Sequence, residues 1–128
     1  MHMIATLQST VVDCPDPAAL AAFYAGILGW EVDGREADWV TLNGPGGRQL
    51  AFQQAVDHVP PDWPDLSRPQ QMHLDFDVPE HADADRARRE VEALGARFLH
   101  DSGGAHRGFL VFADPAGHPF CLCYGQRG

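Results

Sequence analysis

A histidine and an aspartate in the segment 71–78 form the pair of side chains best suited to acid–base chemistry. The segment alternates polar and apolar residues, and a period of two predicts a β-strand with one polar and one apolar face. His73 and Asp75 lie two residues apart on the polar face. An imidazole beside a carboxylate can act as a general acid or base near neutral pH, and we predict this catalytic role for the pair. The alternative is a histidine that only hydrogen-bonds within the wall of a cavity.

Two cysteines near the C-terminus offer thiol chemistry. Cys121 and Cys123 alternate with apolar residues in the segment 119–124, which is predicted as a strand. A thiol with a lowered pKa serves as a nucleophile or metal ligand, but no basic residue adjoins either cysteine in sequence. A buried cysteine that packs as a small apolar side chain is the alternative. Because their spacing on one strand face is too short for a relaxed disulfide, we predict two free thiols.

Aromatic residues are frequent enough to line a pocket for a flat or apolar ligand. Trp39 and Phe109 lie in predicted strands, and Trp63 lies in a proline-rich segment. We predict that these three rings contact a ligand, with Trp63 folding over the mouth of a cavity. The alternative for Trp63 is a ring that fixes the proline-rich segment to the outside of the sheet.

These residues belong to a unit that occurs twice in the chain. Val12-Asp13-Cys14-Pro15 and a helix ending at Leu28-Gly29-Trp30 return as Phe76-Asp77-Val78-Pro79 and a helix ending at Leu94-Gly95-Ala96. The copies are about 65 residues apart, the length of a whole supersecondary unit. Neither copy can bury a sheet alone, so we expect both within one domain, with a cavity where the sheets meet.

Each copy is predicted as a β-α-β-β-β module, which gives an α+β fold. In the first module (about 4–54), Asp16 caps a helix that Gly29 ends. Its strands are predicted at 7–12, 31–35, 39–42 and 49–53, with turns near Gly34 and at 43–47. In the second module (about 71–125), strands at 71–78, 97–100, 109–113 and 119–124 accompany a helix at about 82–94. The segment 55–70 has four prolines and is predicted as the linker.

Composition indicates one ordinary globular domain and excludes some partners. The chain has 128 residues, 45% of them hydrophobic, and a net charge of −9. This charge repels nucleic acid and anionic membrane surfaces, and no apolar segment approaches membrane-spanning length. Three cysteines without a CxxC pair suggest reduced thiols, so we predict a cytoplasmic protein.

The ordered set of motifs resembles the vicinal oxygen chelate superfamily, the group of glyoxalases, bleomycin-resistance proteins and extradiol dioxygenases. The matching stretches lie at 13–17, at 23–24 with 28–30, at 72–78 and at 114–120. They run through nearly the whole chain in the order of the family. The resemblance implies two β-α-β-β-β modules forming a concave mixed sheet around a cavity, and a homodimer.

The resemblance also implies a metal ion held by the first and last strands of each module, through His or Gln and Glu side chains. The corresponding positions are Ser9 and Ala51 in the first module and His73 and Cys121 in the second, with Cys121 standing where a Glu is expected. Only His73 keeps its type. Together with Gln53, next on the face of Ala51, the donors fall short of three strong ligands. We therefore predict no cofactor; the alternative is Zn, Ni, Mn or Fe held by His73, Gln53 and Cys121.

Two functions remain open at this point. The first is a metal-independent module that binds a small organic molecule in the cavity, as in the bleomycin-resistance branch. Its predicted contacts are Ser9, Gln53, Trp39, Trp63, Phe109 and Cys121. The second is a lyase or isomerase of the glyoxalase type, or an oxygenase, that uses His73 with a weakly held metal.

Overall fold

The computed structural model describes residues 3–126. The chain forms two compact units, one ending at His58 and the other beginning at Val59. The boundary between them falls inside the predicted linker. None of the helices in the described part of the chain is long and apolar enough to cross a membrane.

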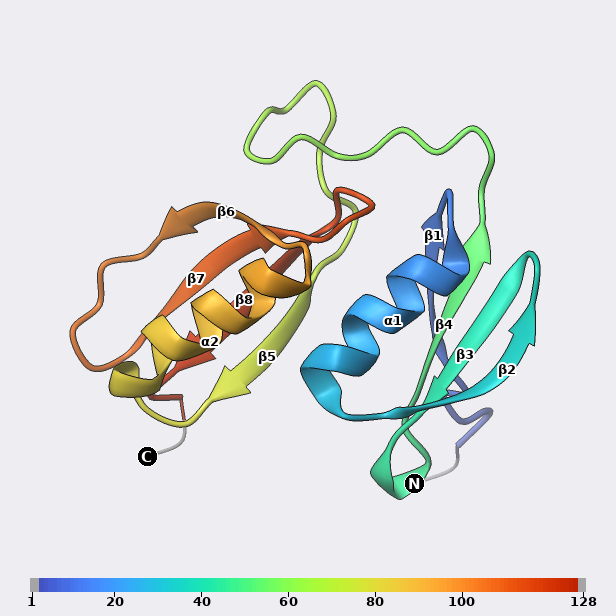
Figure 1. Ribbon diagram of the computed structural model, residues 1–128, viewed down its shortest axis with the longest axis horizontal. Helices are drawn as coiled ribbons and strands as arrows, with labels where there is room; N and C mark the ends of the chain where they lie inside the picture. The colour runs from blue at the N-terminus through green and yellow to red at the C-terminus, as the bar shows by residue number, and fades with distance from the viewer. Residues whose placement is uncertain (1–2, 127–128) are drawn as a thin grey trace. The chain divides into compact units, whose positions relative to one another are not determined.

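The first unit is one helix on one face of a four-stranded mixed sheet (Figure 1). The strand order is β1-β4-β3-β2, with β1 parallel to β4 and the other neighbours antiparallel. Its elements are β1 (Thr10–Cys14), α1 (Pro17–Leu28), β2 (Glu31–Glu36), β3 (Trp39–Asn43), a short 3₁₀ turn (Pro45–Gly47) and β4 (Gln49–Gln54).

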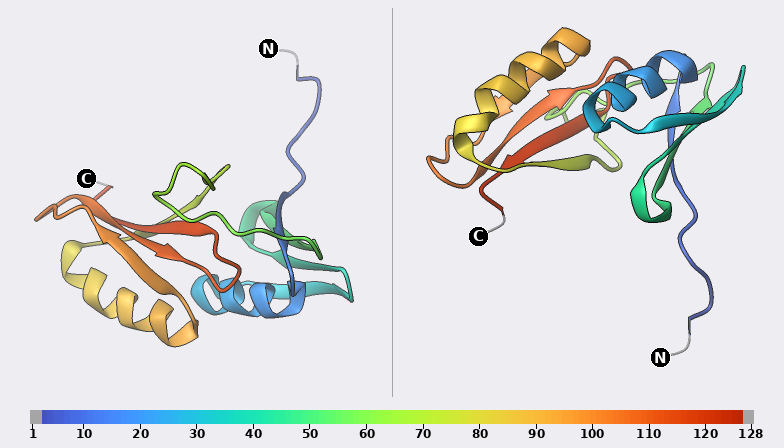
Figure 2. Two further views of the ribbon diagram at one scale, coloured as in Figure 1. Left: turned by 90° about the horizontal axis from the view of Figure 1, so that it is seen from above. Right: turned by 60° about the horizontal axis from the view of Figure 1, so that its bottom comes forward.

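The second unit repeats this arrangement, as both views of Figure 2 show for its helix and sheet. The strand order is β5-β8-β7-β6, again with one parallel pair, β5 with β8. Its elements are β5 (Leu74–Val78), α2 (His81–Leu94), β6 (Arg97–Asp101), β7 (Gly108–Ala113) and β8 (Pro119–Tyr124).

The predicted internal repeat is confirmed, and the two copies also share the position of a β-bulge. Both units have the order β-α-β-β-β and the same strand order in the sheet. Each also carries a β-bulge in its second strand, between Val32 and Gly34 in β2 and between Phe98 and His100 in β6. The α+β fold with two modules is therefore the observed one.

The largest differences from the sequence-based prediction are two strand starts and the position of one turn, whereas the other element bounds agree to within about two residues. β1 begins at Thr10 rather than at residue 7, and β5 begins at Leu74 rather than at 71. Gly34 does not form a turn: it lies within β2 beside the bulge, and the turn falls at Ala37 and Asp38 instead. Glycine suits both a turn and a bulge, so the residue type alone does not distinguish them.

Each core lies between the helix and the facing side of its own sheet. In the first unit, the rings of Tyr24 on α1 and Phe52 on β4 stack at 5.7 Å between centroids. In the second unit, Phe120 on β8 contacts Phe76 at 5.8 Å and Phe112 at 5.3 Å. These rings share the face of the sheet that packs on the helix, so the alternate residues of each strand point to the other face.

The N-terminus of α1 has the predicted cap. Asp16 has extended backbone dihedrals, and its Oδ1 accepts a hydrogen bond from the backbone N–H of Ala19 at 3.2 Å. We expect Asp16→Ala to lower the free energy of unfolding by about 1 kcal/mol, because one backbone donor loses its partner. Urea denaturation measures this change; Asp85→Ala, on the exposed surface of α2, serves as a control with a smaller effect. An unchanged stability of Asp16→Ala would contradict the capping role.

Candidate functional site

The face of the second sheet that points away from α2, called here the helix-distal face, carries the chemically active side chains. The strand register places Asp75 (β5), Cys121 (β8), Val111 (β7) and His100 (β6) in one row across all four strands. Neighbouring strands lie about 4.8 Å apart, so this row spans roughly 14 Å. The next row contains Asp77, Cys123 and Phe109. The face therefore extends over the length of a small organic molecule.

At the β5 end of this face, three different side chains converge. The Nε2 atom of His73 lies 3.3 Å from Oδ1 of Asp75. Donor atoms of His73, Asp75 and Cys121 all lie within 4.8 Å of one another. The side chains of His73 and Asp75 are 39% and 60% exposed, whereas Cys121 is only 8% exposed. The predicted His73–Asp75 pair is thus formed, and a buried thiol lies beside it.

The two thiols of β8 are held in the protonated form. Burial raises the pKa of Cys121 to about 12, and the negative charge of Asp75 adds to this shift. Burial and the charges of Asp75 and Asp77 raise the pKa of Cys123 to about 11. Both cysteines are free thiols, as predicted. Neither is a thiolate nucleophile at neutral pH.

Aromatic rings line the opposite, β6 end of the helix-distal face. The ring of Trp63 contacts the His100 ring edge-on, with 5.9 Å between centroids. His100 in turn lies 6.4 Å from the ring of Phe109, which is 41% exposed. The Trp63 ring therefore lies beside the helix-distal row, to which His100 belongs. Its role at the mouth of a cavity stays a prediction.

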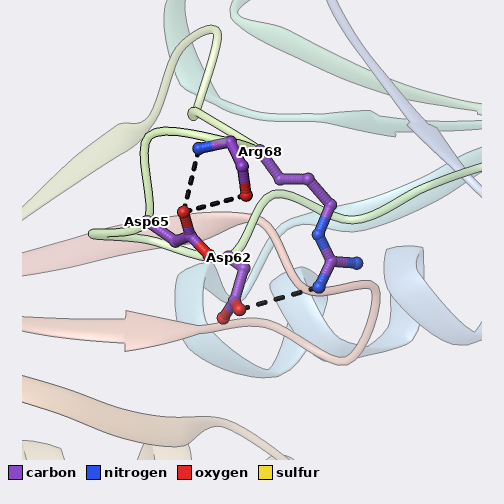
Figure 3. Close-up of polar contacts among 4 residues, drawn as sticks. Asp62, Asp65 and Arg68 are labelled. Carbon is purple, nitrogen blue, oxygen red and sulfur yellow. Dashed lines mark hydrogen bonds and ion pairs between the residues drawn. The ribbon is translucent and has the colours of Figure 1, made fainter.

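The loop that carries Trp63 is closed by its own polar contacts (Figure 3). The backbone N–H of Asp62 donates to the carbonyl of Arg68 at 2.9 Å, and their side chains form an ion pair at 3.6 Å. Within the loop, Oδ1 of Asp65 accepts hydrogen bonds from the N–H and hydroxyl of Ser67, which lower the pKa of the Asp65 carboxyl. These contacts define the path of the proline-rich segment that presents Trp63.

The remaining predicted site residues belong to the first unit. Gln53 on β4 is exposed and is the register partner of Trp39 on β3, so both lie on the face of that sheet away from α1. Ala51 is fully buried and has no side-chain donor. Ser9 precedes β1, and its hydroxyl donates to the carbonyl of Thr10 at 3.4 Å. The structure thus brings Gln53 and Trp39 together, as it does His73, Asp75 and Cys121.

Sequence reasoning missed the closeness of Asp75 to Cys121 and the part of His100 in the aromatic group. Asp75 and Cys121 are register partners on parallel strands that are 46 positions apart in the chain. The period of two showed that each residue lies on the polar face of its strand, but it contained no information on register. His100 faces this side only because of the bulge after Phe98, which shifts the alternation by one residue.

A family model for the glyoxalase-like domain matches residues 9–123. The chain belongs to this family. The match covers both units, so the resemblance noted in the sequence is confirmed. A search of curated protein sequences finds no significant match to this glyoxalase-like chain.

Solved structures of the superfamily share the fold. A glyoxalase/bleomycin resistance protein/dioxygenase family enzyme from Burkholderia phytofirmans has a TM-score of 0.74 and 19% identity, covering 94% of this chain and 98% of that one. The fosfomycin resistance protein FosX from Listeria monocytogenes has a TM-score of 0.73 and 17% identity, and the match covers 97% of this chain and 96% of that one. A lactoylglutathione lyase from Agrobacterium tumefaciens has a TM-score of 0.65 and 20% identity, and the match covers 94% of each chain. At these identities the likeness establishes the fold alone.

The glyoxalase-like fold implies a divalent metal, and the second unit offers a donor set that fits some metals better than others. His73 supplies nitrogen, Cys121 sulfur and Asp75 a carboxylate oxygen. Zinc accepts all three donor types, whereas Mg²⁺ and Mn²⁺ prefer several oxygen ligands. A cation would also favour the thiolate over the thiol of Cys121. The residues therefore fit a zinc-class ion and do not fit an oxygen-preferring ion.

Proposed function

We propose that this glyoxalase-like protein binds a small organic molecule on the helix-distal face of the second sheet. The observation that carries the proposal is the pairing, on one face, of the polar His73–Asp75–Cys121 cluster with the Trp63–His100–Phe109 aromatic group. Ligand sites typically combine an apolar surface with a few well-placed polar groups. The partial exposure of His73, Asp75 and Phe109 leaves these side chains accessible to a ligand.

The charges on this face indicate how the ligand is oriented. The β5 end carries the carboxylates of Asp75 and Asp77, so a group that donates hydrogen bonds belongs there. The β6 end carries rings, against which a flat or apolar part of the molecule packs. Val111 lies between the two ends in the same row.

The His73–Asp75 pair can move a proton without a metal. When Nε2 donates its hydrogen toward Asp75 Oδ1 at 3.3 Å, the Nδ1 atom keeps its lone pair and can accept a proton from the ligand. The carboxylate stabilises the imidazolium that results. We infer that any proton transfer on this face passes through His73.

Equilibrium dialysis of the chelator-treated protein against a panel of small aromatic and apolar compounds tests this proposal. We expect a saturable ligand whose affinity falls about tenfold or more in His73→Ala, because a polar contact to the ligand is lost. His106→Ala is the matched control, since His106 is exposed in the loop between β6 and β7. A panel without a saturable ligand, or equal losses in the two variants, would refute the proposal.

A second candidate function is a metal-dependent lyase, isomerase or oxygenase. The observation that favours it is the closeness of three donor side chains within 4.8 Å. A bound cation would polarise a substrate oxygen, while His73, Asp75 and Cys121 would hold it. Elemental analysis after purification without chelator tests this function. Substoichiometric metal, with no gain in activity from added nickel, zinc, manganese or ferrous iron, would exclude it.

A further inference from the structure

We propose that the ligand of the helix-distal face is an organic cation that carries an aromatic ring. Its ammonium or guanidinium group lies at the β5 end, beside Asp77 and Glu80, and its ring packs on Phe109 toward the β6 end. This inference rests on the proposed function and adds the chemical class of the ligand. The observations that carry it are an acidic cavity, a positive charge at the opposite end of the face, and the distance between the two ends.

A cavity of about 450 Å³ adjoins the β5 end of the face, where β5 leads into α2. Its lining combines an apolar wall with three polar side chains: Asp77, Val78, Pro79, Glu80 and Gln126. The two charged residues among them are both acidic. Small-molecule sites typically measure about 300–1,000 Å³, so this cavity can hold the charged group of a small ligand.

Both carboxylates of this cavity are exposed. Asp77 is the register partner of Cys123 and therefore belongs to the helix-distal face. Glu80 occupies the N-cap position of α2, but its side chain makes no capping hydrogen bond with that helix. The N-terminus of a helix carries about half a positive charge, which the two carboxylates outweigh. An ammonium group is therefore attracted to this end, and a carboxylate is repelled from it.

The opposite end of the face carries a positive charge. Arg97 on β6 is the register partner of Ala113, which is paired with Pro119 on β8. This row alternates with the row of Phe112 and Phe120, whose stacked rings lie in the core beside α2. Arg97 is therefore on the helix-distal face, and it is exposed. Because a cation is repelled at the β6 end and attracted at the β5 end, the charges favour one orientation of the ligand.

The register also sets the distance between the charged end and the rings. Asp77 and Phe109 are both register partners of Cys123, on either side of it. They are thus two strand spacings apart, about 10 Å. The ring of His100 lies 6.4 Å beyond Phe109 and extends the aromatic surface. A ligand that reaches both ends needs a spacer between its ring and its cation, which benzylamine lacks.

The test is equilibrium dialysis of the chelator-treated full chain against three probes of one shape and different charge. The probes are phenylbutylamine, phenylbutanol and phenylbutanoate at neutral pH. We expect the amine to bind saturably and about tenfold or more tightly than the alcohol, because a charged donor makes the stronger hydrogen bond to a carboxylate. The carboxylate should bind more weakly than the alcohol. Benzylamine should bind about tenfold more weakly than phenylbutylamine, because it loses the contacts of one end.

Variants separate the two ends of the ligand. Asp77→Asn and Glu80→Gln keep the shape of each side chain and remove its charge. Each should weaken binding of the amine about threefold to tenfold and leave binding of the alcohol unchanged. Phe109→Ala should weaken both probes alike. Asp85→Asn is the matched control, because it changes the net charge by the same amount on the exposed surface of α2, on the other side of the sheet.

Equal or tighter binding of the alcohol or the carboxylate would overturn this inference, and so would equal amine affinities in Asp77→Asn and Asp85→Asn. Either result leaves the proposed function in place, because a saturable ligand is still bound. If neither these probes nor the wider panel yields a saturable ligand, the proposed function fails and this inference fails with it.

Discussion

Replacing Phe120 by alanine is expected to lower the free energy of unfolding by about 3–5 kcal/mol, the range for a fully buried phenylalanine. Phe120 is 0% exposed, and its ring contacts those of Phe76 and Phe112 on the two flanking strands. The substitution leaves a cavity between helix and sheet that the neighbouring rings cannot fill. Urea denaturation followed by circular dichroism measures the change.

Phe109→Ala is the matched control for this prediction. Phe109 lies on the neighbouring strand β7 but points to the helix-distal face and is 41% exposed. We expect a stability loss below about 1.5 kcal/mol, because less area returns to water. Equal losses in the two variants would contradict the assignment of the two faces.

Gly125→Ala is expected to lower the free energy of unfolding by about 2–5 kcal/mol. Gly125 follows β8 with a φ of 69°, in the left-handed region that costs other residues about 1–2 kcal/mol. A Cβ atom there would also collide with the backbone carbonyl of His106, which cannot move as a side chain can. The backbone shift that removes this overlap costs about a further 1–3 kcal/mol of stability. Thermal and urea denaturation measure the total.

Gly103→Ala separates the two contributions. Gly103 has a φ of 81°, but a Cβ atom added to it meets nothing within 4 Å. We expect its loss to be about 1–2 kcal/mol, from the backbone conformation alone. If Gly103→Ala and Gly125→Ala lower the free energy of unfolding equally, the close approach of the His106 carbonyl does not contribute to the loss at Gly125.

The two faces of β8 have different roles: one packs in the core, and the other carries the two thiols. Phe120, Leu122 and Tyr124 are buried toward α2, whereas Cys121 and Cys123 alternate with them toward the helix-distal face. The packing of the first set holds the strand that positions the thiols. A substitution on the α2 side should therefore reduce stability and ligand binding together, while one at an exposed residue of the helix-distal side should reduce binding with a smaller loss of stability.

Much of the fold was predictable because it depends on local patterns. The repeat, both helices, the Asp16 cap and the αL termini at Gly29 and Gly95 follow from spacing and residue type. Strand starts were less predictable. Residues such as Leu7 favour strands, but the pairing of β1 with β4 begins only at Thr10, opposite Leu50. Pairing with β4, rather than propensity, decides where β1 begins.

The candidate site was predictable only in part. The His73–Asp75 pair followed from the period of two, since residues i and i+2 share a strand face. The thiol state of Cys121 was anticipated from the lack of a basic neighbour in sequence, but its cause is burial and the charge of Asp75, a residue on another strand.

The sequence by itself therefore determined the two modules, the order of their elements and, in the strands without a bulge, the face on which the polar side chains lie. Only the tertiary structure decided which of these side chains meet: Asp75 with Cys121, and Trp63 with His100. The physical reason is that periodicity is a property of one segment. Register between distant strands and the path of a loop arise from hydrogen bonding and packing summed over the whole unit.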